Sequence, residues 1–314
     1  MMNPKVKANL AKFQSIIGLV IFSIIISFLS DRFMTGSNMF NVLRQTSINA
    51  IMAVGMTFVI LTGGIDLSVG ATFAFSGAVA AYLVGTGQNP IVALVIALLV
   101  GMSIGIANGV IISKGRLQPF IVTLATMTIF RGATLVFTDG KPISTGYEAN
   151  AEFFSSIGNG YLFGIPNPIL IMIVVVGLAY IILKHTTIGR YVFATGGNED
   201  ATKLSGVNVH RVKLFVYGVS GMMAALAGII ITARLSSAQP TAGTGYELDA
   251  IAAVVLGGTS LSGGIGSVLG TIVGALIIGI LNNALNLLNV SPYFQLLAKG
   301  FVILIAVLLD RKEK

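Results

Sequence analysis

The stretch IVALVIALLVGMSIGIANGVII, residues 91–112, contains no charged residue and decides the fold class. A helix of this length rises ~1.5 Å per residue and can cross the ~30 Å hydrocarbon core of a bilayer. It ends at the polar turn Ser-Lys-Gly-Arg, residues 113–116, where a helix would leave the membrane. The stretch therefore predicts a membrane-spanning helix.

The composition of the whole chain extends this prediction to an integral membrane protein. Of the 314 residues, 55% are hydrophobic and only 10% are charged, whereas soluble domains carry about 25% charged residues. The chain has no cysteine, which excludes disulfides, thiolate nucleophiles and zinc–thiolate sites. The net charge is +8, but the basic residues are scattered at the ends of apolar segments, so we expect neither a nucleic-acid partner nor a cofactor.

Apolar segments along the chain predict an all-α, polytopic protein of about ten transmembrane helices. Together they form a single transmembrane domain, residues 1–314. Residues 31–47 and 138–160 are expected to be polar excursions between them. The predicted spans are residues 13–30, 48–63, a segment ending near 84, 91–112, 119–137, 166–183, 214–233, 248–262, 266–285 and 293–309.

An even number of spans puts both termini on one side, and the positive-inside rule indicates the cytoplasm. Basic residues predicted inside are Lys5, Lys7, Lys12, Lys114, Arg116, Lys184, Arg190, Lys203, Arg211, Lys213, Arg311, Lys312 and Lys314. Those predicted outside are far fewer, namely Arg32, Arg44, Lys141 and Arg234. We therefore expect a multi-pass protein of the cell membrane with both termini cytoplasmic.

The longest charged run, residues 184–213, predicts a cytoplasmic loop that contains one short helix, Glu199 to Ser205. Asn198 is a good N-cap, and Glu199 and Asp200 favour the positive end of the helix dipole. Gly206 can take the left-handed conformation that ends a helix. An ordinary loop and a docking helix for a cytoplasmic partner are both compatible with this pattern. The residues of the docking interpretation are Asn198, Glu199, Asp200, Ala201, Lys203, Leu204 and Gly206.

Asp66 is expected to be the only carboxylate near the interior of a span, within TGGIDLSVG at residues 62–70. It lies either in a plain cytoplasmic turn or in a broken helix that reaches a polar cavity. A similar break, GGTSLSGG at residues 257–264, carries hydroxyls instead. The residues assigned to the translocation path or to broken helices are Gly64, Asp66, Ser68, Gly70, Asn108, Arg131, Thr259 and Ser260.

Other polar residues within the spans have less specific interpretations. Arg131 and Lys299 are expected to extend their charged ends outwards to the membrane surface. Asn108, Asn282, Asn283 and Asn286 could hydrogen-bond a hydroxylated solute or a neighbouring helix, and helix contact is the favoured use.

Two tandem Gly-x-x-x-Gly patterns indicate close helix packing. They comprise Gly101, Gly105 and Gly109 in the fourth predicted span and Gly266, Gly270 and Gly274 in the ninth. Spans five places apart run in opposite directions, so the pair suggests an inverted five-plus-five repeat. Coincidence in a chain with 38 glycines is the alternative.

Three stretches together resemble the permease subunits of bacterial ATP-binding cassette sugar importers, in the ribose, xylose and galactose branch. They are GIDLSVG at 64–70, LQPFIVTL at 117–124 followed by Arg131-Gly132, and GGTSLSGG at 257–264 followed by Gly270-Thr271. In such importers the loop that contacts the ATPase carries a Glu-Ala-Ala-x-x-x-Gly pattern. Residues 200–206, DATKLSG, are similar, with Asp for Glu and Thr for the second Ala.

The resemblance implies a subunit that forms the path for a monosaccharide, with ribose as the first candidate. It also implies a second copy of the chain, a cytoplasmic ATPase with two nucleotide-binding halves and an extracytoplasmic sugar-binding protein. The chain itself has no Walker phosphate loop and no His-Glu-x-x-His motif, so we expect no enzyme activity of its own. The alternative is a secondary transporter that uses Asp66 as a proton or cation site.

Overall fold

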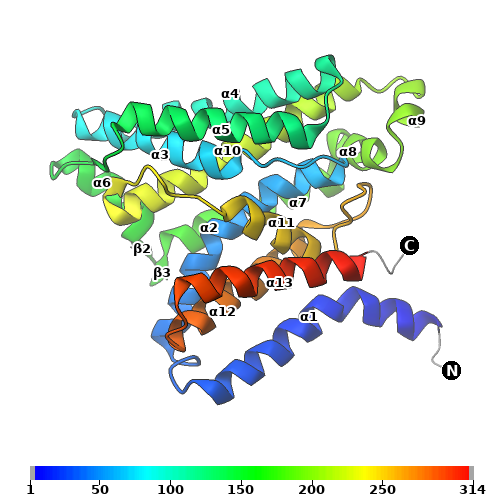
Figure 1. Cartoon of the computed structure of the whole chain (residues 1–314), viewed down its shortest axis with the longest axis horizontal. Helices are drawn as coiled ribbons and strands as arrows, with labels where there is room; N and C mark the ends of the chain where they lie inside the picture. The colour runs from blue at the N-terminus through cyan, green and yellow to red at the C-terminus, as the bar shows by residue number, and fades with distance from the viewer. Residues whose placement is uncertain (1–3, 311–314) are drawn as a thin grey trace.

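The computed structural model describes the backbone of residues 4–310 and the side chains of residues 17–302 and 304. Expectations about the side chains of Lys5, Lys7 and Lys12 and about the tail 311–314 lie outside this part of the chain. The described chain is mostly helical (Figure 1). Its long helices are α1 (Pro4–Leu29), α2 (Gly36–Leu61), α3 (Val69–Gly85), α4 (Pro90–Gly115), α5 (Pro119–Thr138), α7 (Asn167–His185), α10 (Val209–Leu235), α12 (Val268–Leu287) and α13 (Pro292–Asp310).

Shorter helices and two small strand pairs connect the long helices. The short helices are α6 (Ala149–Asn159), α8 (Thr187–Gly197), α9 (Glu199–Leu204) and α11 (Tyr246–Leu256). Strand β1 (Ile143–Ser144) pairs antiparallel with β4 (Ser237–Ala238), with Ile143 opposite Ala238. Strand β2 (Tyr161–Leu162) pairs antiparallel with β3 (Ile165–Pro166), with Tyr161 opposite Pro166.

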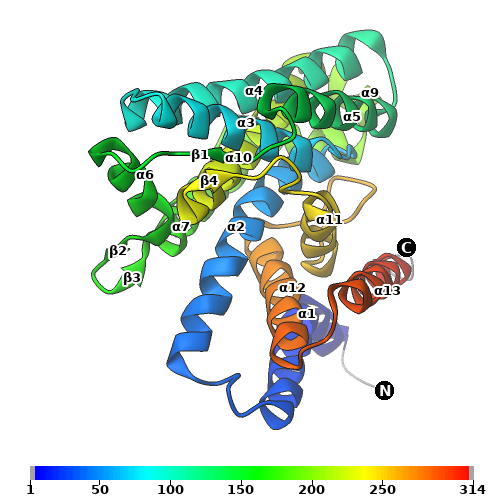
Figure 2. The ribbon, with the colours of Figure 1, turned by 60° about the vertical axis from the view of Figure 1, so that its left-hand side comes forward.

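Helices α2 and α10 form the centre of the molecule. In their most apolar windows, 78% and 67% of the residues are buried, against 17% for α5 and 22% for α7. Figure 2 shows α12, α13 and α1 on one side of α2 and α4 and α5 on the other. Large apolar side chains such as Ile121 on α5 and Val174 on α7 are exposed. This apolar outer surface suits lipid, as expected of a multi-pass membrane protein.

Six helices of the described part are long and apolar enough to cross a membrane, namely α2, α4, α5, α7, α10 and α12. Residues Ile17–Leu29 of α1 and helix α3 are apolar but shorter. The predicted span 248–262 is too long. Helix α11 ends at Leu256, because Gly258, at φ +83°, turns the chain in a conformation that disfavours other residues.

The predicted polar excursions contain more helix than expected. Helix α2 begins at Gly36, so most of residues 31–47 belongs to it. The polar residues that suggested an excursion are partly buried: the side-chain amides of Asn38 and Asn283 donate to each other's oxygens at 3.0 and 2.8 Å. Residues 138–160 include helix α6, and residues 184–213 include α8 in addition to the predicted α9. Hydropathy alone did not indicate these helices.

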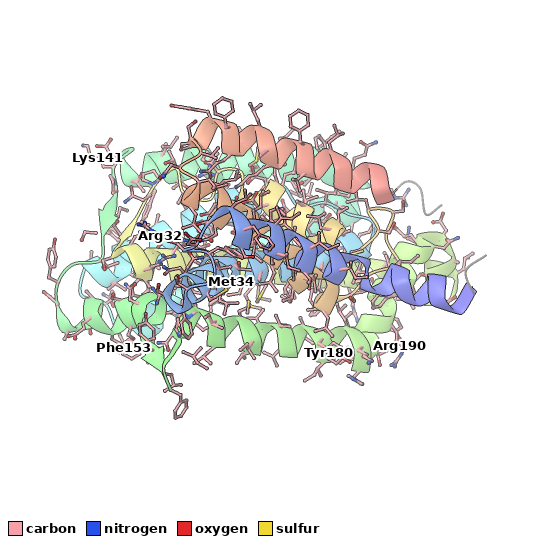
Figure 3. All side chains as sticks on the ribbon, turned by 90° about the horizontal axis from the view of Figure 1, so that it is seen from below. Arg32, Met34, Lys141, Phe153, Tyr180 and Arg190 are labelled. Atoms are coloured by element: carbon pink, nitrogen blue, oxygen red, sulfur yellow. The ribbon has the colours of Figure 1, made fainter. Side chains whose placement is uncertain are left out.

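The two ends of the molecule are built differently. Helices α8 and α9 lie at one end together with the start of α1 and the end of α13 (Figure 1). Helix α6 and both strand pairs lie at the opposite end. Figure 3 shows the same separation, with Tyr180 and Arg190 at the α9 end and Lys141 and Phe153 at the other.

Glycines of the two patterns let helix backbones approach each other. A Cβ atom at Gly101 or Gly105 would overlap the backbone oxygen of Gly221 or Tyr217 on α10. A Cβ atom at Gly109 would lie 2.9 Å from the Cα of Leu214, also on α10.

The second pattern is shorter than expected. Gly270 and Gly274 on α12 contact the backbone of α11 in the same way, at Gly257 and Ala253. Gly266, however, lies before α12 with φ +157°, and a Cβ atom there would overlap the side chain of Thr259, so it belongs to a loop and not to a helical ladder.

Candidate translocation path and coupling surface

A break in the helical path separates α2 from α3. Helix α2 ends at Leu61, and Gly63 adopts φ +76°. The backbone N–H groups of Gly63 and Gly64 donate to the carbonyls of Ile60 and Val59, at 2.8 and 3.2 Å. These bonds satisfy backbone groups that the break would otherwise leave unpaired inside the protein. Residues 62–68 then form a short non-helical segment that enters the interior.

Asp66 lies within this segment and has no exposed area. Its Oδ1 accepts hydrogen bonds from the Ser68 backbone N–H at 3.0 Å and the Ser68 hydroxyl at 2.6 Å. Its Oδ2 accepts from the hydroxyl of Ser220 on α10 at 2.8 Å. These contacts place Asp66 in a buried break between helices and not in an exposed cytoplasmic turn. Asp66 fixes the break to the central helix α10.

The hydrogen-bond network around Asp66 continues into α4 and α5. The Nδ2 of Asn108 donates to the hydroxyl of Ser68 at 2.9 Å. The Oδ1 of Asn108 accepts from the hydroxyl of Thr126 on α5 at 2.6 Å. Asn108 is fully buried, so its amide joins helices, which agrees with the helix contact favoured from the sequence. Four elements thus meet at one polar cluster.

Arg131 points inwards, contrary to the expectation that it would extend to the membrane surface. Its Nη1 donates to the backbone oxygens of Pro240 and Ala242, at 3.3 and 2.8 Å. These carbonyls belong to the non-helical segment before α11. A Cβ atom at Gly70, at the start of α3, would overlap the Gly243 oxygen of the same segment. Arg131 and Gly70 therefore face the start of α11 from two sides.

Thr259 and Ser260 lie in a second break, between α11 and α12. The Thr259 N–H donates to the Val254 oxygen at 3.2 Å, and the Ser260 N–H donates to the Ile265 oxygen at 2.9 Å. Both hydroxyl residues therefore lie in a loop that is closed by backbone hydrogen bonds. This loop does not belong to the Asp66 cluster. The two are connected through backbone contacts at the end of α2.

Three segments of the chain are in backbone contact next to the two breaks. The N–H of Gly264 donates to the carbonyl oxygen of Leu61 at 3.0 Å. A Cβ atom at Gly196, near the end of α8, would overlap that same Leu61 oxygen and the Gly264 nitrogen. The end of α2, the α11–α12 loop and the end of α8 are therefore in direct backbone contact. We name Leu61, Gly196, Gly263 and Gly264 the backbone junction.

Helix α9 follows α8 directly and has both of the predicted ends. The Oδ1 of Asn198 accepts from the Ala201 N–H at 2.9 Å, which is the predicted N-cap bond. Gly206 adopts φ +84°, and its N–H donates to the Lys203 oxygen at 3.0 Å. Leu204 is 90% exposed, so the apolar side chain does not pack within the chain.

Glu199 ties α9 to the start of α10. It forms ion pairs with Lys203 at 2.7 Å and with Lys213 at 2.8 Å. Burial alone would raise the pKa of Glu199, but the hydrogen bonds and charges of both lysines outweigh burial and lower the pKa. A lowered acid pKa means that the tie is present at neutral pH and is lost only as pH falls through that value. Next to it lies a groove of about 770 Å³, lined by residues that include Arg116, Asp200, Lys203 and His210.

Comparison with known proteins identifies the family. Residues 38–307 match the family described as the branched-chain amino acid transport system permease component. The chain belongs to this permease family. No solved structure matches it.

Curated relatives of the permease match over nearly its whole length. The ribose import permease protein of Haemophilus influenzae is 58% identical over 95% of this chain and 92% of the relative. That of Bacillus subtilis is 54% identical over 95% and 92%. The D-allose transport system permease protein of Escherichia coli is 40% identical over 93% and 89%. The chain is thus a permease subunit of a transporter and does not belong to a family of catalytic enzymes.

Two acidic residues of the permease were missed by the sequence reasoning. Asp249 on α11 is 2% exposed and pairs with Lys299 on α13 at 2.8 Å. Glu247 lies half-buried two residues before it, next to Gly70. Asp66 is therefore not the only carboxylate inside the protein, and Lys299 does not extend to the surface. The signal was available, because Asp249 and Lys299 carry opposite charges within two predicted spans.

The described part of the permease offers no clear metal site. No group of three or more His, Asp or Glu side chains in it could hold a metal ion. His210 lies against the hydroxyl of Ser113 on α4, and His185 packs its ring against Tyr180. Both histidines have protein partners near the α9 end.

Proposed function

We propose that the chain is the membrane-spanning subunit of an ATP-binding cassette importer that carries ribose into the cytoplasm. The observation that carries this proposal is the 54–58% identity to ribose import permeases over 95% of the chain. Uptake would require a cytoplasmic ATPase, an extracytoplasmic sugar-binding protein and a second copy of the permease. The chain supplies the path, and ATP hydrolysis takes place on the separate ATPase.

Helix α9 is the part of the chain that we assign to the ATPase. Its exposed Leu204, capped ends and anchoring to Lys213 support this assignment, because a docking helix needs an apolar contact on a fixed base. The assignment extends to Asn198, Glu199, Asp200, Ala201, Lys203 and Gly206. Movement of α9 would reach both breaks through the backbone junction at Gly196.

We also propose ten membrane crossings in an inverted five-plus-five arrangement, which the packing of the helices supports. In chain order the crossings would be α1, α2, α3, α4, α5, α7, α10, α11, α12 and α13. Helix α4 packs on α3 and α10, and helix α12 packs on the corresponding α11 and α2. The basic residues Lys114, Arg190, Lys203, Arg211 and Lys213 gather at the α9 end, which favours a cytoplasmic position for that end and for both termini.

A secondary transporter with Asp66 as its ion site is the other candidate. Both oxygens of Asp66 already accept hydrogen bonds from protein groups, and the side chain has no exposed area. These contacts favour a structural role in the broken helix over ion coupling.

The test is affinity purification of the tagged permease from its native membranes, followed by identification of the attached subunits. We expect an ATPase at stoichiometric amounts. Reconstitution of the purified complex with the sugar-binding protein should then give ATP-dependent uptake of labelled ribose. Absence of an ATPase from the purified complex, or uptake of ribose without ATP, would contradict the proposal.

A further inference from the structure

A second, smaller cavity lies at the end of the molecule opposite α9. It has a volume of about 300 Å³, is partly open to the outside, and is lined by residues of α2, α10, α11, α12 and α13. Pockets for small ligands begin near this size, and the space corresponds to about ten water molecules at ~30 Å³ each. We name it the amide cavity, after the residues that line it.

Three helices each present a pair of polar side chains to the amide cavity. The pairs are Gln45 and Asn49 on α2, Asn282 and Asn286 on α12, and Gln295 and Lys299 on α13. In every pair the two residues are four positions apart, which places both on the same face of their helix. Five of the six side chains are neutral carboxamides. Such a set is unusual inside a membrane-spanning chain, where polar groups are expensive and mark functional positions.

Several of these amides lack a protein partner. In the described part of the chain, the buried Oδ1 of Asn282 has no partner, and the half-buried side chains of Gln45 and Asn49 make no hydrogen bond to protein. The other two amides are paired, because the Nε2 of Gln295 donates to the Oδ1 of Asn286 at 2.9 Å. Buried polar atoms are normally paired, so atoms left open require another group to pair with. A carboxamide offers both a donor and acceptors, as a sugar hydroxyl does. The open groups therefore match a ligand rich in hydroxyls.

Among the residues that line the amide cavity, one carboxylate and two basic groups carry charge, so one positive charge is left over. Asp249 and Lys299 pair with each other at 2.8 Å. Arg234 and Tyr246 also line the cavity, and a guanidinium donates hydrogen bonds to hydroxyls as well as to carboxylates. A neutral ligand needs no counter-charge, whereas an anion would be held by Arg234 and by the charge of Arg44 close to it.

We propose that the amide cavity binds a neutral monosaccharide within a single permease chain. This inference deepens the proposed function and rests on it for the identity of the sugar. The amides would take over hydrogen bonds from water as the sugar enters the membrane part of the importer. The cavity thus gives the permease a sugar site of its own, in addition to that of any binding protein.

Thiol protection tests this site directly, because the chain has no cysteine. Gln45→Cys or Asn49→Cys places a single thiol in the amide cavity of the full-length permease in nanodiscs. The probe is a small, charged methanethiosulfonate reagent, and the ligand is D-ribose. At ribose ten times above its Kd, labelling should slow about tenfold, because only the free fraction reacts. The matched control is Gln88→Cys, in an exposed turn, whose labelling should not change.

The outcomes separate clearly. Unchanged labelling of both cavity thiols in ribose would overturn the inference, and so would protection by gluconate in place of ribose. If either cysteine variant is unstable, direct ribose binding to Gln45→Leu and Asn282→Leu replaces it. We expect at least a tenfold weaker Kd in both, with Gln88→Leu unchanged and wild-type thermal unfolding for Gln45→Leu. Wild-type affinity in these variants would equally overturn the site.

Failure of this inference is distinguishable from failure of the proposed function. If the complete importer takes up ribose with ATP but ribose does not protect the cavity thiols, the proposed function stands and the sugar site is rejected. If ribose protects the cavity thiols but the permease neither binds an ATPase nor imports ribose with ATP, the sugar site stands and the proposed function is rejected.

Discussion

At the scale of single residues, Asp66 is the most informative position. Hydrogen bonds to a charged acceptor contribute ~1.5–3 kcal/mol, and those between neutral groups ~0.5–1.5 kcal/mol. Asp66→Asn keeps the size of the side chain but removes the charge, so each of its three bonds should weaken by about 1 kcal/mol. We expect a lower rate of ribose uptake at matched membrane abundance, with retained assembly. Reconstituted uptake assays measure this.

The matched control for Asp66→Asn is Asp139→Asn. The side chain of Asp139 is 87% exposed and pairs with the exposed Lys141. Such surface pairs contribute ~0–1 kcal/mol, so uptake should stay at the wild-type level. If both variants took up ribose at the wild-type rate, the hydrogen bonds of Asp66 would not be required for transport.

At the scale of helices, the contact between α4 and α10 depends on glycine. Gly105→Ala would place a methyl group against the Tyr217 backbone oxygen, and overpacking of this kind costs ~1–3 kcal/mol or more. We expect a lower midpoint of thermal unfolding in detergent. Gly177→Ala on α7 is the control, because a Cβ there meets nothing within 4 Å, and its midpoint should stay or rise. A stable Gly105→Ala protein would show that α4 can move away from α10 without cost.

The end of α9 gives a second prediction at this scale. Gly206 has φ +84°, a conformation that costs a β-branched residue more than ~1 kcal/mol. Gly206→Val should therefore disturb the α9 end and reduce sugar-stimulated ATP hydrolysis by the reconstituted complex, while the amount of permease in the membrane stays normal. Gly197→Val, nine residues earlier, has open space and no positive φ, and should hydrolyse ATP normally. Full stimulation in Gly206→Val would argue against docking through α9.

At the scale of the whole molecule, the energy source separates the two candidate functions. Proteoliposomes with the complete importer, loaded with ATP and treated with a protonophore, should still accumulate ribose. The sequence argument for this expectation was the scarcity of buried carboxylates, which Asp249 and Glu247 have weakened. The argument now rests on the occupied oxygens of Asp66. Loss of uptake when the proton gradient collapses would favour the secondary transporter.

Sequence patterns predicted the long helices well where proline, glycine or charge marks their ends. The predicted span 119–137 corresponds to Pro119–Thr138, and 91–112 lies within Pro90–Gly115. The predicted span 248–262 extends past the end of α11, because the glycine-rich loop that follows the helix is as apolar as a membrane span. The inward position of Arg131 depends on Pro240 and Ala242, which are more than a hundred residues away. Such partners arise from tertiary packing, which hydropathy does not describe.

The backbone junction has a mechanical consequence. Ordinary contacts between helices pass through side chains, whose rotamers can absorb small displacements before the next element responds. Gly196 has no side chain between its Cα and the carbonyl of Leu61, and Gly264 is hydrogen-bonded to the same carbonyl. A displacement of α8 would therefore be passed directly, from backbone to backbone, to the end of α2 and to the loop between α11 and α12.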